Sequence, residues 1–452
     1  MYRLFSPRSV PIKILVFCFL VSLFTVISVR AEEPADPAQD LKSLSLDQAL
    51  SSAVEHSPEL QKADAAREQM GWKQVEGFSV FLPSINVAGS YFFTKKYQFI
   101  DIPFNGVMAS IPQIFPTSSA TFNAQWMLFD GLHNVNTYRS TRHLKSAAEA
   151  DYTWKKFSLS EDVKLAYAQV VAAKKLENVS EQNLKTLQNH LDQVQKLKSG
   201  GISTNYDVLR VEAQLSEADA EMLQARDNIQ IAREKLGQVL GLDGPVDALD
   251  SSELEVPSSD PVKNLRYGDD HQRLDLQALS ERVYASDLTD SASGSFWIPK
   301  ISLNGQYVMY NNLNDTLSDW ERYRSGWSAG FFLNWDIFSP TEFAKSKEEK
   351  YKAIQNQKSL RQATLAAPVD FAFWKKRYLY SATLYLAKKA DLERAQETVR
   401  LAEAGFKAGV RTTTEVLDAE LELFKARAGI VHSQMNCTEA KLKLELALGQ
   451  TI

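Results

Sequence analysis

The 452-residue chain lacks the residue clusters on which most enzyme chemistry depends. It contains no Gly-Lys-Ser/Thr turn that would cradle a phosphate and no Gly-x-Ser-x-Gly elbow that would present a nucleophilic serine. Cysteine and histidine nowhere have the spacing of a metal site. The histidines are scattered: His56, His133, His143, His190, His271 and His432. The sequence therefore predicts a protein that is not an enzyme and needs no cofactor or metal, so a partner must supply the energy for any transport.

Cysteine is almost absent, and basic residues are not in excess. The first 31 residues carry three basic residues, then an apolar run over 14–29, and end in Val29-Arg30-Ala31, which indicates a secretory signal peptide. Cleavage after Ala31 removes Cys18 and leaves Cys437 alone, so no intramolecular disulfide is expected. No cysteine lies at the new N-terminus, which argues against a lipid anchor there. Cleavage also removes four positive charges and changes the formal net charge from -5 to -9, which excludes a basic nucleic-acid surface.

Beyond the leader, no stretch reaches the roughly 20 apolar residues of a membrane helix. A membrane protein with this sequence must therefore cross the bilayer as strands. Segments 85–93, 122–128, 301–309 and 331–337 alternate apolar and polar residues and have about the length of transmembrane strands. They carry aromatic residues suited to an interfacial girdle: Tyr91, Phe93, Trp126, Phe129, Tyr307, Trp335 and Phe338. We expect two pairs of strands, with surface loops at about 94–118 and 311–324.

The chain contains a tandem duplication. Residues 198–241 align with residues 406–449 without a gap, and 14 of the 44 positions are identical. Both copies have a small-residue turn, from Gly201 or Gly409, followed by a helix with apolar residues at alternating spacings of three and four. Such a seam over five heptads is typical of coiled coils. We expect a first repeat at 32–242, a linker at 243–274 that is rich in Pro, Ser and Asp, and a second repeat at 275–452.

The helices are much longer than a bilayer is thick. A proline-free segment from Leu132 to Lys198 has 67 residues, which corresponds to about 100 Å of helix. Shorter helices near 46–78 and 205–240 have a similar summed length and are expected to stack end to end beside it. The second repeat predicts a long helix from about Glu342 to Lys407, with a kink at Pro368. The expected fold is mainly α, with a transmembrane β-barrel and a long coiled-coil helical tube.

Strand counting predicts an oligomer. A sheet in lipid must close on itself because every backbone polar group there needs a partner. Single-chain barrels begin at eight strands, whereas this chain has four. Counting alone allows an eight-stranded barrel from two copies or a twelve-stranded barrel from three.

The order helix, strand pair, long helix, turn and helix, repeated after a signal peptide, resembles the TolC-like outer-membrane efflux protein family. The resemblance covers nearly the whole mature chain, and the segment from Gly409 to Ala419 is its most specific part. It implies a homotrimer with a twelve-stranded barrel in outer-membrane lipid. It also implies a periplasmic helical tube that meets an inner-membrane pump through a periplasmic adaptor protein.

The resemblance also implies roles for residues at the tips of the helices. Arg411 matches an arginine that ties the two helix pairs together, and Asp207 matches its acidic partner. Tyr206 stands where the reference member has a threonine, and Phe406 where it has a tyrosine, so a phenolic hydrogen bond of the entrance gate is missing. Glu415 and Asp418 match two rings of acids at the constriction. Adaptor docking is expected at both tip turns: Gly201, Thr204, Val208, Leu209, Gly409, Thr412, Val416 and Leu417.

Two hypotheses of function follow. The first is a passive outer-membrane duct of a tripartite efflux or type I secretion system. The second is a structural coiled-coil protein of the envelope, in which the alternating segments form a soluble domain without a pore. Detergent-dependent extraction from an outer-membrane fraction separates them.

Overall fold

The computed structural model describes residues 42–93, 97–104, 106–114, 118–249, 254, 260–268, 273–311 and 323–452. All of them belong to one unit, Lys42–Ile452. The predicted signal peptide, part of the linker and the centre of the second predicted loop lie outside these residues.

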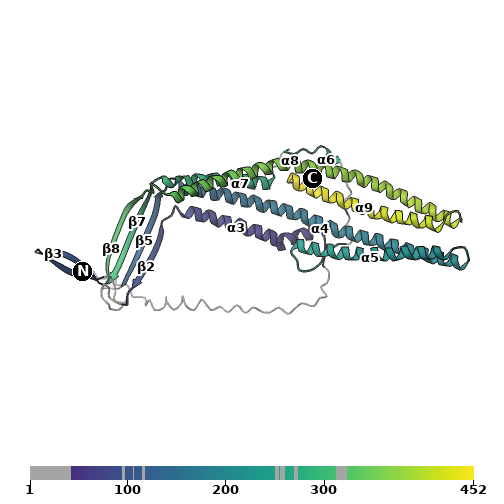
Figure 1. Ribbon diagram of the computed structural model, residues 1–452, viewed down its shortest axis with the longest axis horizontal. Helices are drawn as coiled ribbons and strands as arrows, with labels where there is room; N and C mark the ends of the chain where they lie inside the picture. Colours follow the sequence, from purple (N-terminus) through teal and green to yellow (C-terminus); the bar gives the residue numbers. More distant parts are fainter. Residues whose placement is uncertain are drawn as a thin grey trace, which may run out of the picture. The chain divides into compact units, whose positions relative to one another are not determined.

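Two helix pairs dominate the described chain (Figure 1). The bounds are α4 His133–Ser199 and α5 Asn205–Leu240 in the first repeat, and α8 Pro340–Lys407 and α9 Thr413–Leu448 in the second. The long helices have 67 and 68 residues, or about 100 Å each, and the length of the first is the one that its lack of proline predicted. Helix α8 continues on both sides of Pro368. No helix in the described residues is long and apolar enough to cross a membrane.

The helix expected near 46–78 is instead two helices, α2 Leu46–His56 and α3 Pro58–Ser79. The single-helix prediction was wrong because it ignored Pro58. A proline disfavours the helical conformation of the residue before it, and Ser57 is extended, with φ −62° and ψ 119°. Pro58 then starts the next helix, where its missing N–H costs nothing.

In the second repeat, α7 Leu274–Ser293 takes the corresponding place before the strands and is followed by a short 3₁₀ turn, Gly294–Trp297. Helix α4 packs against α3 and α7 in its first half and against α5 in its second half (Figure 1).

Four strands form one antiparallel sheet in the order β2-β5-β7-β8 (Figure 1). Their bounds are β2 Ser84–Tyr91, β5 Ser118–Phe129, β7 Lys300–Asn311 and β8 Arg324–Asn334. The two predicted pairs are therefore confirmed as strands, although β8 begins earlier and ends before Trp335. The outer strands β2 and β8 each pair with a single neighbour among the described residues.

The register separates the sheet into an apolar and a polar face. Val87, Phe122, Tyr307 and Trp327 are cross-strand partners in one row. The adjacent row on the opposite face is Asn86, Asn123, Gln306 and Ser328. In that row Asn123 Nδ2 donates to Asn86 Oδ1 at 2.9 Å, and Gln306 Nε2 donates to Asn123 Oδ1 at 3.1 Å. The period-two pattern thus places apolar and amide side chains on opposite sides, as it predicted.

The first predicted surface loop contains two further strands, β3 Tyr97–Phe104 and β4 Val107–Ile114, paired as an antiparallel hairpin. The sequence did not reveal them, because Pro103 and Pro112 count against a strand. A two-stranded ribbon tolerates proline because each strand keeps one free edge. Gly106, with φ 78°, supplies the turn between the strands.

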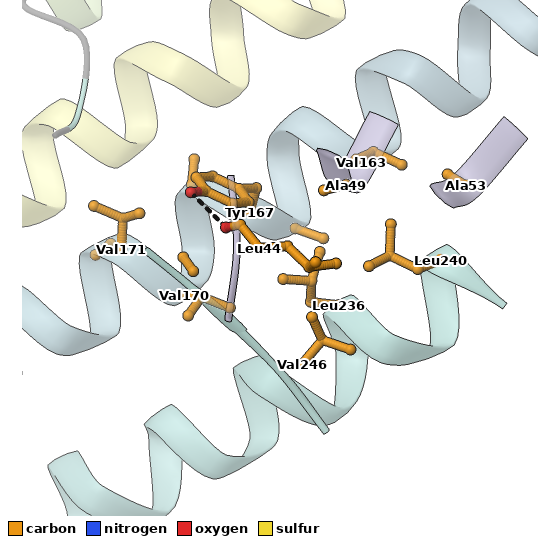
Figure 2. Packing of buried hydrophobic residues seen from close by; sticks show 14 of the residues in the cluster. Leu44, Ala49, Ala53, Val163, Tyr167, Val170, Val171, Leu236, Leu240 and Val246 are labelled. Carbon is orange, nitrogen blue, oxygen red and sulfur yellow. Dashed lines mark hydrogen bonds between the residues drawn. The ribbon is translucent and has the colours of Figure 1, made fainter. Parts of the chain in front are cut away.

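The largest buried core lies where α2, α4 and α5 meet a small parallel sheet of β1 Lys42–Leu44 and β6 Val246–Ala248 (Figure 2). Leu44 and Val246 pack there against Val170 and Leu236. The Tyr167 hydroxyl donates to the Leu44 carbonyl at 3.1 Å. Part of the predicted linker is therefore folded. Strand β6 lies within the predicted linker and belongs to this core, and the short helix α6 Asp260–Lys263 also lies within the predicted linker.

Candidate functional site

The turns that join α4 to α5 and α8 to α9 have the same backbone geometry. At the first, Ile202 N–H donates to the Leu197 carbonyl at 2.9 Å, and Gly201 N–H donates to the Lys198 carbonyl at 3.0 Å. At the second, Val410 N–H donates to the Gly405 carbonyl at 2.9 Å and Gly409 N–H to the Phe406 carbonyl at 3.0 Å. This is the Schellman termination, in which a glycine adopts the left-handed conformation. Gly201 and Gly409 both have φ 77°, so the sequence repeat is also a repeat of structure.

Each turn is followed by a capping box that starts the returning helix. Thr204 Oγ1 accepts from the Asp207 N–H, and Asp207 Oδ2 accepts from the Thr204 N–H at 2.9 Å. Thr412 and Glu415 make the same reciprocal pair. The backbone hydrogen bond from Thr204 is the main reason that the pKa of Asp207 is lowered, and the bond from Thr412 acts likewise on Glu415. Both carboxylates therefore stay ionised and hold the ends of their helices.

Arg411 does not contact Asp207 in the protomer. Its Nη1 donates to Glu415 Oε1 at 2.7 Å, one turn along its own helix pair. Gly405 makes room for it, since a Cβ at that position would lie 2.5 Å from Arg411 Cγ. Asp207 is occupied by Thr204 and by Ser203, whose hydroxyl donates at 3.0 Å. The predicted Arg411–Asp207 link is not made within one chain, where each carboxylate caps its own helix; between copies of the chain it stays a prediction.

Arg210 makes a polar link between the tips of the two hairpins. Its Nη1 donates to Thr414 Oγ1 at 3.2 Å, and its Nη2 lies 3.5 Å from Asp418 Oδ1. Sequence comparison did not single out Arg210, because nothing in a linear pattern tells which basic residue of one hairpin faces which acid of the other. Each predicted acid position consequently has an arginine partner in the same chain: Arg411 for Glu415 and Arg210 for Asp418.

Apolar contacts also join the tips. Leu417 of α9 is completely buried, at 0% exposure, in a cluster with Leu187 and Val194 of α4 and with Val208 and Val211 of α5.

Three of the predicted docking residues are buried within the chain, so they support the helices. Val208 and Leu417 lie in this cluster, and Val416 lies in a second cluster with Val399 and Ala402. The remaining predicted docking residues are exposed: Gly201, Thr204, Leu209, Gly409 and Thr412. Two apolar side chains that the sequence analysis missed stand out at the turns themselves: Ile202 and Val410, each 77% exposed. Each directly follows the glycine of its turn, and this shared position in the two copies could have identified them in the sequence.

The two residues that depart from the family pattern lie apart from the Arg210 link. Tyr206 is exposed on α5. Phe406 is partly buried near the end of α8, and its ring lies 5.9 Å from the ring of His190 on α4. Among the described residues, no group of three or more His, Cys, Asp or Glu side chains is placed to hold a metal ion.

Comparison with known proteins matches this architecture. A family-level sequence model described as "Outer membrane efflux protein" matches residues 49–242 and 271–450. The chain is similar to Outer membrane protein TolC of Escherichia coli (strain K12), 23% identical over 414 residues, which covers 87% of this chain and 80% of that protein. It is also similar to Outer membrane protein TolC of Vibrio cholerae, 23% identical over 407 residues, with 88% and 89% covered. The solved structure of the Campylobacter jejuni CmeC outer membrane channel has the same fold, with a TM-score of 0.74 at 15% identity, covering 92% of this chain and 90% of that one.

Proposed function

From the membership of this chain in the outer membrane efflux protein family, we propose that it is the outer-membrane duct of an efflux or type I secretion assembly. Three copies close a twelve-stranded barrel, and their helix pairs form a periplasmic tube that ends at the two tips. Each repeat, 32–242 and 275–452, contributes two strands, one long helix and one tip, joined through residues 243–274. An inner-membrane pump and a periplasmic adaptor supply energy and cargo.

The observation that carries this proposal is the four-stranded sheet. Its outer strands β2 and β8 each pair on one side only in the described residues, and its two faces are of opposite polarity. In lipid, unpaired strand edges are too costly to persist, so the sheet must be completed by further copies. The row that contains Phe122 and Trp327 suits hydrocarbon, and the amide row around Asn123 suits a water-filled interior. Twelve strands from three copies satisfy both requirements.

The tips support a gated entrance. Arg210 and Leu417 join the two hairpins of one chain. The exposed turn residues, with Ile202 and Val410 foremost, are the surface offered to the adaptor.

The test is the mass of the mature protein in mild detergent, combined with conductance in a planar lipid bilayer. A trimer that forms ion-conducting pores is the expected result. A monomer or dimer, or a trimer that forms no pore, contradicts the proposal and favours an envelope scaffold.

A further inference from the structure

A buried polar pair crosses from the first hairpin to the second close to the tips. His190 of α4 is 4% exposed and Glu420 of α9 is 7% exposed, with Nδ1 and Oε1 3.9 Å apart. Neither residue belongs to the turns, to the caps or to the Arg210 link.

The pair is incompletely satisfied. His190 Nε2 and Glu420 Oε2 are both buried without a hydrogen-bond partner among the described residues. Buried polar atoms of this kind are rare in folded proteins and are costly to keep. Separation of α4 from α9 would expose both atoms to water. A change in the charge of His190 or Glu420 can therefore shift the balance between the packed and the separated helices.

The surroundings determine which charge states the pair tolerates. Phe406 of α8 covers the imidazole, with ring centroids 5.9 Å apart. Leu187 and Val194, on the turns of α4 before and after His190, are buried with Leu417 of α9. Glu403 of α8 is the charged group whose field acts on Glu420. An apolar seam with a second carboxylate nearby disfavours an ionised Glu420.

We propose that His190 and Glu420 are positioning residues that hold the closed entrance while the buried pair carries a single proton, on Glu420. This inference rests on the proposed duct function and adds a specific control of its gate. The protonated Glu420 carboxyl and the neutral His190 imidazole form the closed arrangement, and loss of the proton leaves a carboxylate in an apolar seam.

The pKa values support the direction of this effect. Burial, with Glu403 second, raises the pKa of Glu420 from 4.5 to about 7, whereas burial lowers the pKa of His190 from 6.5. For Glu420, closure is favoured at low pH and weakens as the pH rises through about 7. For His190, closure is favoured at high pH and weakens as the pH falls below 6.5. The two effects oppose each other in mildly acidic solution, because the closed pair and the opened pair then both hold one proton.

The experiment measures pore conductance of the reconstituted full-length protein at pH 6 and pH 8. In the wild type the opposing effects partly cancel, so the closed-to-open ratio should fall from pH 6 to pH 8 by clearly less than tenfold. His190→Gln removes the opposing effect, and the fall should grow to about tenfold. Glu420→Gln removes the main effect and should reverse the sign, so that closure is stronger at pH 8. The double variant, His190→Gln with Glu420→Gln, should have the same closed-to-open ratio at pH 6 and pH 8.

Glu212→Gln is the matched control, because Glu212 holds the position of Glu420 in the first repeat but is exposed on α5. It should keep the wild-type profile. Glutamine is nearly isosteric with glutamic acid, and detergent mass measurement checks that each variant assembles. If Glu420→Gln or His190→Gln leaves the pH dependence of the conductance unchanged, this inference is wrong and the proposed function still stands. Absence of wild-type pores at either pH overturns the proposed function with it.

Discussion

Arg210 and Asp418 occupy the same position in the two repeats and face each other across the hairpins, with Nη2 and Oδ1 3.5 Å apart. The duplication thus carries opposite charges at one equivalent position, and the fold brings the two copies of that position together. A neighbouring contact, from Arg210 Nη1 to Thr414 Oγ1 at 3.2 Å, anchors the same guanidinium. The link between hairpins therefore depends on a difference between the repeats.

Arg210→Ser should open the entrance more than Arg411→Ser does. The first substitution removes both contacts of Arg210 with the second hairpin, whereas the second removes only a contact within α9 and its turn. Because the pair is partly exposed, we expect a loss of about 1 kcal/mol or less for each protomer. Single-channel conductance and sensitivity of cells to large antibiotics provide the measurements. Equal conductance of the two variants would show that apolar packing around Leu417 holds the tips closed.

Exchange of the two charges should restore the link. Arg210→Asp and Asp418→Arg each place like charges opposite one another and should raise the conductance. The double variant recreates the pair in the reverse direction, and its conductance should return most of the way to the wild-type value. A double variant as open as the sum of the single variants would mean that the two side chains do not interact.

Gly409→Ala should destabilise the second tip by about 1 kcal/mol, because its φ of 77° strains any residue with a Cβ. The destabilisation does not come from a steric clash, since no heavy atom lies within 4 Å of a Cβ added at this position. Gly71→Ala is the control: it also has open space, but it lies within helix α3. That substitution should stabilise the protein by roughly 0.5 to 1 kcal/mol. Hydrogen exchange at the tip and thermal unfolding distinguish the two, and similar behaviour would contradict the turn geometry.

The charge of Glu415 should persist well into acidic solution. Its pKa is lowered first by the Thr412 backbone hydrogen bond and then by Arg411, so the carboxylate is lost only as the pH falls below the ordinary carboxylate range. Together with Asp418, it should make the entrance cation-selective and sensitive to multivalent cations. Selectivity in planar bilayers should be nearly constant from pH 8 to pH 5, and Glu415→Ala/Asp418→Ala should reduce it. A double variant with unchanged selectivity would exclude these residues from the constriction.

The protein should lose stability as the pH rises through about 7 because of a second buried acid. Glu445 of α9 is buried against Glu161 of α4, and burial, followed by the hydrogen bond with Glu161, raises its pKa to about 7. A raised carboxyl pKa means that the folded state favours the proton, so stability is lost as that proton leaves. Glu445→Gln should reduce the difference in unfolding temperature between pH 6 and pH 8, and the part that remains belongs to Glu420. Glu439→Gln, at an exposed position of the same helix, should retain the whole difference.

Local patterns were sufficient to predict the long helices, the tip turns and the four strands of the large sheet. Backbone preferences of neighbouring residues produce each of these patterns. They are the proline-free run to Lys198, the small-residue turns at Gly201 and Gly409, and the alternation around Tyr307. These predictions are confirmed as α4, the two left-handed turns and β7. Pro58 carried an equally local signal, and the break that it causes was readable from the sequence.

Only the tertiary structure decided which side chains meet. Arg210 and Arg411 are both basic residues near a tip, and their linear neighbourhoods do not reveal that one reaches the other hairpin and the other caps its own. His190 and Glu420 are 230 positions apart in the printed sequence, and their contact exists because α4 and α9 pack side by side. Helix and strand periods are set by interactions over a few residues, whereas the facing of two helices depends on the packing of the whole seam.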